Sequence, residues 1–247
     1  MIVSHQHRFI FIKTEKTAGT TMEAILAKAC GPADVITPKT DIPKRNYRFP
    51  IVETRMTDAL SRLVRGKHPL GRKFQNHTSA AEAKRLLGSA IFDSYFKFTI
   101  VRHPYERVIS LYFWERQRQK VGDMTIEDYV RANASRIADH WTLYGTDEQL
   151  LVDDYIFYET LEAGARRVFA NLNLPVELTE GFRQTKHKGS ARPEGTDYRS
   201  LLTTEAKLLI YLLCKREFET FGYDTELDGL LPRNLAARAV PNEGQAG

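Results

Sequence analysis

The residues best suited to chemistry in this chain gather first in a short stretch, EKTAGTT, at residues 15–21. Aromatic and β-branched residues precede it at 8–14 and predict a buried strand, and helix-favouring residues follow it at 20–31. A loop that leaves a strand and enters a helix presents backbone N–H groups and the positive end of the helix dipole at one point. We therefore expect this loop to bind an anion such as a phosphate.

The side chains of the loop suit that role. Ala18 and Gly19 are small, so a ligand oxygen can approach the backbone closely. Lys16 brings a positive charge that can follow a leaving group. Three hydroxyl donors complete the loop: Thr17, Thr20 and Thr21. The alternative is a plain strand-to-helix turn with a threonine cap and a surface lysine.

Two common nucleotide signatures are missing from this loop. The Walker A pattern GxxxxGK[ST] does not fit, because the lysine here precedes the glycine. The glycines of the dinucleotide pattern GxGxxG are absent as well. The ligand must therefore be inferred from the rest of the chain.

A second stretch, RHPYERVIS at 102–110, repeats the arrangement of the first. Arg102 ends the predicted strand 95–102, where open α/β sheets place their ligands, and a predicted helix follows. Arg107 and Ser110 are three residues apart and share a face of that helix. Arg102 and Ser110 are expected to converge on a second phosphate, with the guanidinium as a planar fork. Two such stretches predict one ligand with two separated phosphate groups.

With both stretches in view, the sequence resembles the sulfotransferases that use 3′-phosphoadenosine 5′-phosphosulfate (PAPS), especially the carbohydrate-type family 2 group and its bacterial relatives. These enzymes carry a PKTGGTS-like loop for the 5′-phosphosulfate and an RxPxxRxxS stretch for the 3′-phosphate. The likeness runs from Phe9 to Tyr223 and includes NHTSA at 76–80. Glu15 stands where the family usually has proline, and Ala18 where glycine is common.

The pattern of elements predicts a single α/β domain over residues 1–231, followed by a disordered tail at 232–247. The resemblance implies a P-loop-like three-layer fold with a central, mainly parallel sheet flanked by helices. The stretch 199–223 is expected to end in a long amphipathic helix that Gly222 closes.

The resemblance also implies roles in donor binding. Lys16 would contact the bridging and leaving oxygens of PAPS, and the backbone and hydroxyls of the loop would cradle the 5′-phosphate. Arg102 and Ser110 would hold the 3′-phosphate, which the product PAP retains. A basic loop before the last helix would close over the nucleotide with three side chains: Lys186, Lys188 and Arg192.

The reaction also needs a base for the acceptor hydroxyl. Histidine titrates near neutral pH, and His77 lies where similar carbohydrate enzymes carry a histidine just before a helix. The alternatives are Glu23, on the first helix, and His103, beside Arg102. Transfer of this kind requires no metal, and no cluster with metal-ligand spacing stands out.

Composition limits the remaining possibilities. The 247 residues suit a globular α/β protein, and no apolar run approaches the roughly 20 residues of a membrane span. The two cysteines, Cys30 and Cys214, both fall in predicted helices and suggest no disulfide framework, so a reducing, cytoplasmic location is expected. The start of the chain does not resemble a cleaved signal.

The charge is unevenly distributed. The chain carries a net charge of +5, yet residues 39–73 contain ten basic and three acidic residues. This stretch favours an anionic acceptor such as an acidic glycan, although a neutral or lipid-linked sugar stays open. The competing functions are a basic nucleic-acid-binding module, a nucleotide phosphotransferase and an inactive protein that binds PAPS or PAP. We expect no nucleic-acid partner.

Overall fold

The computed structural model describes residues 1–37, 74–182 and 198–227. The chain forms two compact units. Unit 1 comprises Met1–Val101 and Thr142–His187, and unit 2 comprises Arg102–Trp141 and Lys188–Gly247. The single domain expected from the sequence therefore stays a prediction, and the expected C-terminal tail lies outside the described residues.

Unit 1 is built on a five-stranded mixed sheet with the order β3-β1-β2-β4-β5. The neighbours β2, β4 and β5 run parallel, whereas β1 pairs antiparallel with both β2 and β3. The strands are β1 (Ile2–Ser4), β2 (Phe9–Ile12), β3 (Val35–Ile36), β4 (Phe96–Val101) and β5 (Asp154–Phe157). The predicted strands at 8–14 and 95–102 are confirmed, and β1 and β3 add an antiparallel edge that the sequence did not reveal.

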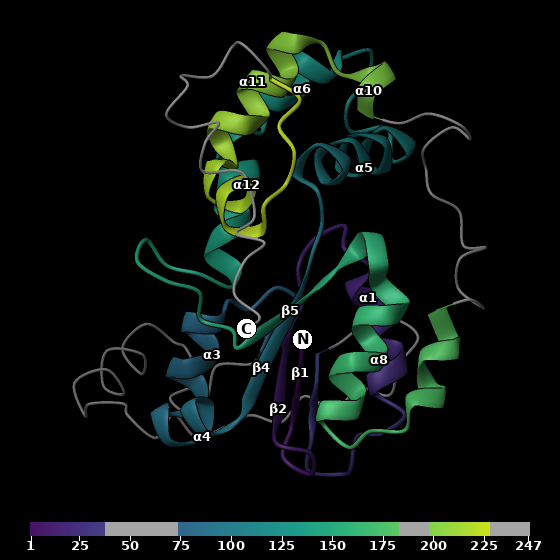
Figure 1. The fold of residues 1–247 in the computed structure, drawn as a ribbon. Coiled ribbons are helices and arrows are strands. Elements are labelled where there is room, and N and C mark those ends of the chain that lie inside the picture. Colours follow the sequence, from purple (N-terminus) through teal and green to yellow (C-terminus); the bar gives the residue numbers. More distant parts are fainter. Residues whose placement is uncertain (38–73, 183–197, 228–247) are drawn as a thin grey trace, which may run out of the picture. The chain divides into compact units, whose positions relative to one another are not determined.

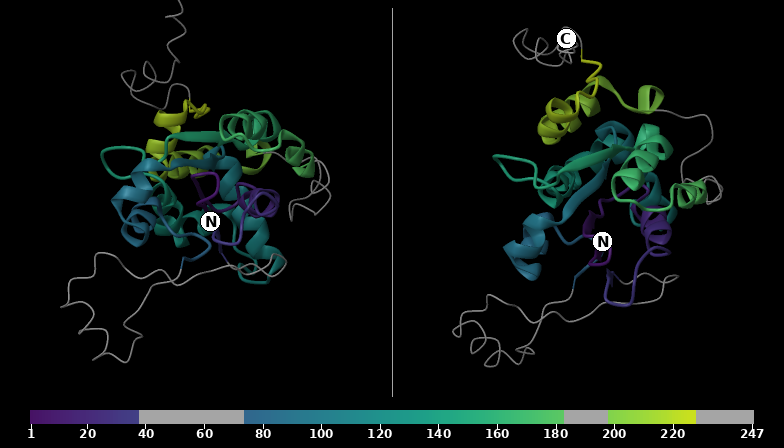
Figure 2. Two further views of the ribbon diagram at one scale, coloured as in Figure 1. Left: turned by 90° about the horizontal axis from the view of Figure 1, so that it is seen from below. Right: turned by 60° about the horizontal axis from the view of Figure 1, so that its bottom comes forward.

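Helices cover both faces of this sheet, as the two directions of view in Figures 1 and 2 show. On one side lie α1 (Gly19–Leu26) and α8 (Leu161–Asn171), and on the other lie α3 (Ala80–Leu87) and α4 (Ser89–Ser94). Phe11, Phe98 and Ile156 of three neighbouring strands are fully buried in the core shared with α1 and α8. Both faces of β2 and of most of β4 are buried, as expected of parallel strands inside a sheet, whereas β5 at the edge is partly exposed. The α/β fold with flanking helices is thus confirmed.

A buried aspartate ties the hairpin between β1 and β2 to the chain that follows α1. One carboxylate oxygen of Asp34 accepts hydrogen bonds from Ser4 Oγ (2.7 Å) and the N–H of Gly31 (2.9 Å). The other oxygen accepts from the N–H groups of His5 (2.7 Å) and Gln6 (3.2 Å). Burial alone would raise the pKa of Asp34, but these four hydrogen bonds outweigh it and lower the pKa below its ordinary value.

We expect Asp34→Ala to lower the free energy of unfolding by about 2–3 kcal/mol, because four donors lose their shared acceptor. Since the folded-state pKa of Asp34 is depressed, the carboxylate stabilises the fold above the ordinary carboxyl pKa, and this contribution is lost as the pH falls through the lowered value. Calorimetric unfolding at neutral and acidic pH measures both effects. Asp93, which pairs with Lys84 on the surface, is the control, and Asp93→Ala should cost about 1 kcal/mol at most. Equal losses at the two positions would contradict the role of Asp34.

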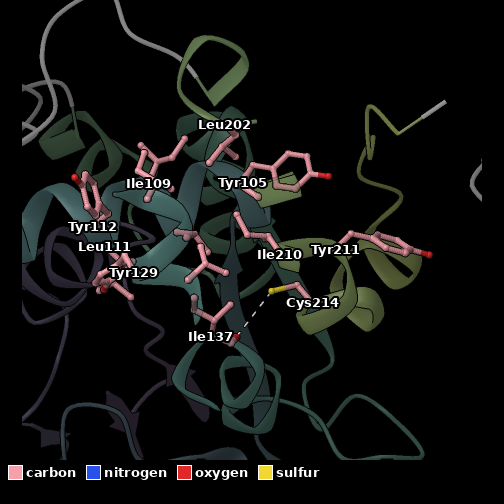
Figure 3. Packing of buried hydrophobic residues seen from close by; sticks show 14 of the residues in the cluster. Tyr105, Ile109, Leu111, Tyr112, Tyr129, Ile137, Leu202, Ile210, Tyr211 and Cys214 are labelled. Atoms are coloured by element: carbon pink, nitrogen blue, oxygen red, sulfur yellow. Dashed lines mark hydrogen bonds between the residues drawn. The ribbon is translucent and has the colours of Figure 1, made fainter. Parts of the chain in front are cut away.

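Unit 2 consists of helices in the part that the structure describes. They are α5 (Pro104–Gln117), α6 (Ile126–Ala132), α7 (Ala134–Ala138), α10 (Tyr198–Leu201), α11 (Thr204–Leu213) and α12 (Lys215–Phe221). Figure 3 shows their shared core, in which Ile109, Tyr129 and Ile210 come from three different helices and are almost fully buried. Three 3₁₀ helices complete the described elements of the chain: η1 (Asp139–Leu143), η2 (Tyr158–Thr160) and η3 (Val176–Glu180). None of the helices in the described ranges is long and apolar enough to cross a membrane.

The prediction of one long helix at the end of 199–223 is wrong, because two shorter helices, α11 and α12, occupy this stretch. Thr203 caps the start of α11 by accepting a hydrogen bond from the N–H of Ala206, and Cys214 separates α11 from α12 with a non-helical backbone (φ −113°, ψ 19°). Gly222 does close α12 in the left-handed conformation, as predicted. The first helix also ends earlier than expected, so Cys30 lies outside it.

Candidate functional site

The first predicted loop follows β2 and is pinned to the neighbouring strand. The Thr14 hydroxyl donates to the carbonyl oxygen of Ile100 in β4 (2.7 Å) and lies 2.7 Å from the Thr17 hydroxyl. Thr99 forms a similar bond from β4 to the carbonyl oxygen of Ile12 (2.8 Å). These bonds fix where the loop leaves the sheet. Because the Thr17 side chain is fully buried, its hydroxyl shapes the loop from within.

The backbone of the loop is unusual for residues other than glycine. Lys16 and Ala18 both lie in the left-handed region, each with φ 60°. Ala18 stands at the N-cap position of α1, and no side chain caps the helix there. Left-handed residues that alternate with other conformations turn successive N–H groups toward one point, which makes an anion-binding hollow. Such strained conformations in non-glycine residues also concentrate at functional sites.

His77 lies beside the start of this loop. Its Nδ1 is 3.1 Å from the main-chain oxygen of Lys13. A carbonyl oxygen only accepts, so Nδ1 carries the hydrogen and Nε2 is the basic nitrogen of the neutral ring. The side chain remains exposed on its outer side. Burial of its other side lowers the pKa of His77, which favours the neutral form at physiological pH.

The segment that carries His77 is ordered by the start of α3. The Thr78 hydroxyl accepts from the N–H of Gln75 (2.7 Å). Ser79 caps α3 by accepting from the N–H of Glu82. His77 therefore sits on a short, internally bonded turn.

A buried ion pair that the sequence did not predict lies underneath the loop. Lys13 Nζ binds Glu23 Oε2, and the side chains are 5% and 0% exposed. The other oxygen of Glu23 accepts from Thr37 Oγ1 (2.9 Å) and from the amino group of Met1. Glu23, an alternative candidate for the base, is thus fully buried among partners. This ion pair joins the residue after β2 to the middle of α1, and no local sequence pattern predicts it.

The second predicted stretch begins α5 in unit 2. Arg102 Nη2 donates to Glu106 Oε2 at 3.2 Å, so a carboxylate already shares the guanidinium that was assigned to the 3′-phosphate. Pro104 stands at the first helical position, and the His103 ring caps the helix by accepting from the N–H of Tyr105 at Nδ1 (3.3 Å). The other ring nitrogen, Nε2, lies 3.0 Å from the main-chain oxygen of Asp224. Both nitrogens of His103 therefore have structural partners.

Arg107, which was expected to share a helix face with Ser110, is buried among structural partners. Arg107 is 2% exposed, and its Nη2 donates to Glu217 Oε2 at 2.7 Å and to Cys214 Sγ at 3.3 Å. The second oxygen of Glu217 lies 2.8 Å from His140 Nδ1. This arginine of the second stretch is therefore structural, whereas Ser110 is only partly buried. Burial also raises the pKa of the Cys214 thiol well above its ordinary value.

The structure thus brings one group of predicted residues together in unit 1, where the loop 16–21 and His77 both adjoin Lys13. Arg102 and Ser110 lie at the start and in the second turn of α5 in unit 2. The three expected nucleotide-closing residues lie outside the described ranges: Lys186, Lys188 and Arg192. Within residues 1–37, 74–182 and 198–227, no group of three or more histidine, cysteine or acidic side chains is arranged to hold a metal ion.

Comparison with known proteins places the chain in a family. A curated protein of Archaeoglobus fulgidus, described as uncharacterized, is 29% identical over 96 residues, which span 37% of this chain and 79% of that protein. No solved structure gives a significant match. The sequence model described as the sulfotransferase family matches residues 1–224, which include both predicted stretches and His77. The chain therefore belongs to the sulfotransferase family.

Proposed function

We propose that this protein transfers a sulfuryl group from PAPS to a hydroxyl group of a carbohydrate or glycoconjugate. Family membership supports sulfuryl transfer in general. The observation that carries the proposal is the pairing in unit 1 of a left-handed loop entering an uncapped helix with an exposed histidine whose lowered pKa favours the neutral ring. An anion hollow beside a base is the minimum that transfer from an anionic donor to a hydroxyl requires.

The donor roles follow from the chemistry of each residue. Lys16 enters the loop and would stabilise the charge that develops on the leaving 5′-phosphate. The main-chain N–H groups of residues 17–21 would bind the phosphate oxygens, with Thr20 and Thr21 adding hydroxyl donors. Arg102 and Ser110 would bind the 3′-phosphate and so select PAPS over a donor that lacks this group.

The transfer needs no reactant other than the donor and the acceptor. His77 Nε2 takes the proton of the acceptor hydroxyl as its oxygen forms a bond to sulfur. The bond between sulfur and the bridging oxygen of the donor breaks on the opposite side, and PAP leaves with the electron pair. The acceptor oxygen, the sulfur and the leaving oxygen must lie in line. The protein therefore acts mainly by positioning the two substrates and by stabilising the charge that develops.

The acceptor class rests on the resemblance and on charge. The basic stretch at 39–73 supports an acidic glycan as the acceptor, because opposite charge steers a substrate toward the protein. This stretch lies outside the described residues, so its part in acceptor binding is argued from the sequence alone.

Thermal unfolding with PAP and with AMP tests the donor assignment without knowledge of the acceptor. PAP at a hundredfold excess over its Kd should stabilise the protein by about 2.7 kcal/mol, and AMP at the same concentration by clearly less. Arg102→Ala should abolish the preference for PAP. Arg131→Ala, at an exposed arginine of α6 in the same unit, should keep it. A preference for PAP that survives Arg102→Ala would refute the role of Arg102, and equal shifts for both nucleotides in the wild type would refute PAPS as the donor.

A further inference from the structure

Lys13 contacts the candidate base, the loop at 16–21 and helix α1 in unit 1. Its main-chain oxygen accepts the hydrogen bond from His77 Nδ1 at 3.1 Å. Its side chain runs under the loop, where a Cβ atom added to Gly19 would lie only 2.7 Å from Lys13 Cγ. Its ammonium ends on Glu23 in α1. One residue therefore contacts the candidate base, the floor of the anion loop and the helix that the loop enters.

A buried ion pair with Glu23 holds the Lys13 side chain in one position. Its pairing with Glu23 is almost completely screened from water, and a buried charge that loses its partner is costly. Thr37 and the Met1 amino group complete the surroundings of Glu23. Gly19 is required where the Lys13 stem passes, because any side chain there would displace the stem or the carbonyl oxygen of Thr14, which lies 3.2 Å from the added Cβ. The loop and Lys13 are thus fitted to each other.

The charges that face His77 act in opposite directions. After burial, which is the largest influence and lowers the pKa of His77, the hydrogen bond to the Lys13 carbonyl and the Glu15 carboxylate raise it. The Lys13 ammonium and the Met1 amino group lower it. Glu15 and Lys13 belong to the same short connection after β2. Removal of one charge or the other should therefore shift the pKa of His77 in opposite directions.

We propose that Lys13 is a positioning residue for the reaction, which orients the candidate base His77 through its main chain and supports the anion-binding loop through a side chain anchored on Glu23. The proposal rests on the proposed function, since it assigns a task to His77 in transfer. Lys13 itself touches neither donor nor acceptor in this account. The buried Lys13 charge also helps to keep His77 in the neutral form that can accept a proton.

The test is an NMR titration of the His77 ring in the full chain without nucleotide. Lys13→Met removes the charge and keeps the length of the stem, so the pKa of His77 should move upward. The matched control is Lys97→Met. Lys97 is another buried lysine of unit 1, 7% exposed and paired with Asp153 at 2.9 Å, and its replacement should leave the pKa of His77 unchanged.

Glu15→Gln supplies the opposite arm, because loss of the negative charge should move the pKa of His77 downward. If Lys13→Met does not fold because Glu23 has lost Lys13, the double variant Lys13→Met/Glu23→Gln removes both charges of the pair and should still move the pKa of His77 upward. An unchanged pKa in the foldable Lys13 variant, or a shift of equal size in Lys97→Met, would overturn the proposal.

The titration needs neither donor nor acceptor, so its outcome is independent of the proposed function. A protein that showed no preference for PAP over AMP could still show an upward pKa shift of His77 in Lys13→Met and a downward shift in Glu15→Gln. A protein that preferred PAP could equally lack these shifts. In the active enzyme, the acidic limb of kcat/KM should move to higher pH in Lys13→Met and to lower pH in Glu15→Gln, because His77 must be unprotonated to accept a proton. A residue with only a structural role would lower activity without moving this limb.

Discussion

Alanine in place of Lys16 is expected to reduce sulfuryl transfer from PAPS by about 10²–10³-fold and to weaken PAP binding far less. The reason is that the charge of Lys16 acts chiefly on the leaving oxygen, whose negative charge develops only as the bond to sulfur breaks. The loop backbone, which PAP also contacts in this proposal, stays in place. Single-turnover rates with PAPS and a calorimetric Kd for PAP separate the two effects. Transfer at the full rate in Lys16→Ala would show that the lysine has another task.

Replacement of His77 by glutamine should have a comparable effect, about 10²–10⁴-fold, for a different reason. The base is lost while the hydrogen-bonding shape remains, so the acidic limb of the pH–rate profile should disappear together with the activity. In the wild type this limb should lie below the ordinary histidine pKa, because the pKa of His77 is lowered. His7→Gln, at a partly buried histidine of the same unit, is the control and should keep both rate and limb. A limb that persists in His77→Gln would assign the base to another residue.

A further large effect concerns the stability of unit 2. Glu217→Gln should lower the free energy of unfolding by about 3–5 kcal/mol, because it leaves the charge of Arg107 buried without its counterion. The exposed pair of Arg131 and Glu205 in the same unit is the control, and Glu205→Gln should cost about 1 kcal/mol at most. Urea unfolding followed by tryptophan fluorescence reports on this unit, since the chain's two tryptophans, Trp114 and Trp141, both belong to it.

A double-mutant cycle shows whether the loss comes from the pairing. Arg107→Met/Glu217→Gln removes both charges, so it should cost clearly less than the sum of the two single variants. Additive losses would mean that Arg107 and Glu217 stabilise the core independently. In that case the buried arginine of the RxPxxRxxS stretch would have to be explained by its contacts with Cys214 and the Ile137 carbonyl alone.

The sequence predicted the elements that carry strong local signals. The strand before the loop is a continuous apolar run, and Pro104 and Ser79 mark helix starts with residues whose chemistry favours those positions. The position of the loop at 15–21 was predictable for the same reason, because its small residues and threonines stand at a strand-to-helix junction, whereas its anion-binding role stays a prediction. Strands β1 and β3 were not, since they contain three and two residues and show no periodicity.

The features that the sequence did not reveal share a physical origin in contacts between distant residues. Arg107 stands three residues from Ser110 on the sequence, yet its partner Glu217 lies more than one hundred residues away. The break at Cys214 interrupts a stretch of good helix formers, because tertiary packing can override local propensity. Lys13 and Glu23 each resemble ordinary surface residues in the sequence, and only the folded chain shows that they pair in the interior.

In the proposed function, the donor carries two phosphate groups that the protein recognises separately. A calorimetric comparison of PAP with AMP on the wild-type full chain tests it most directly, because it requires no acceptor. PAP should bind at least about tenfold more tightly than AMP, since the 3′-phosphate adds a charge-assisted hydrogen bond worth about 1.4 kcal/mol or more. Equal dissociation constants for PAP and AMP, or no binding of either, would contradict it.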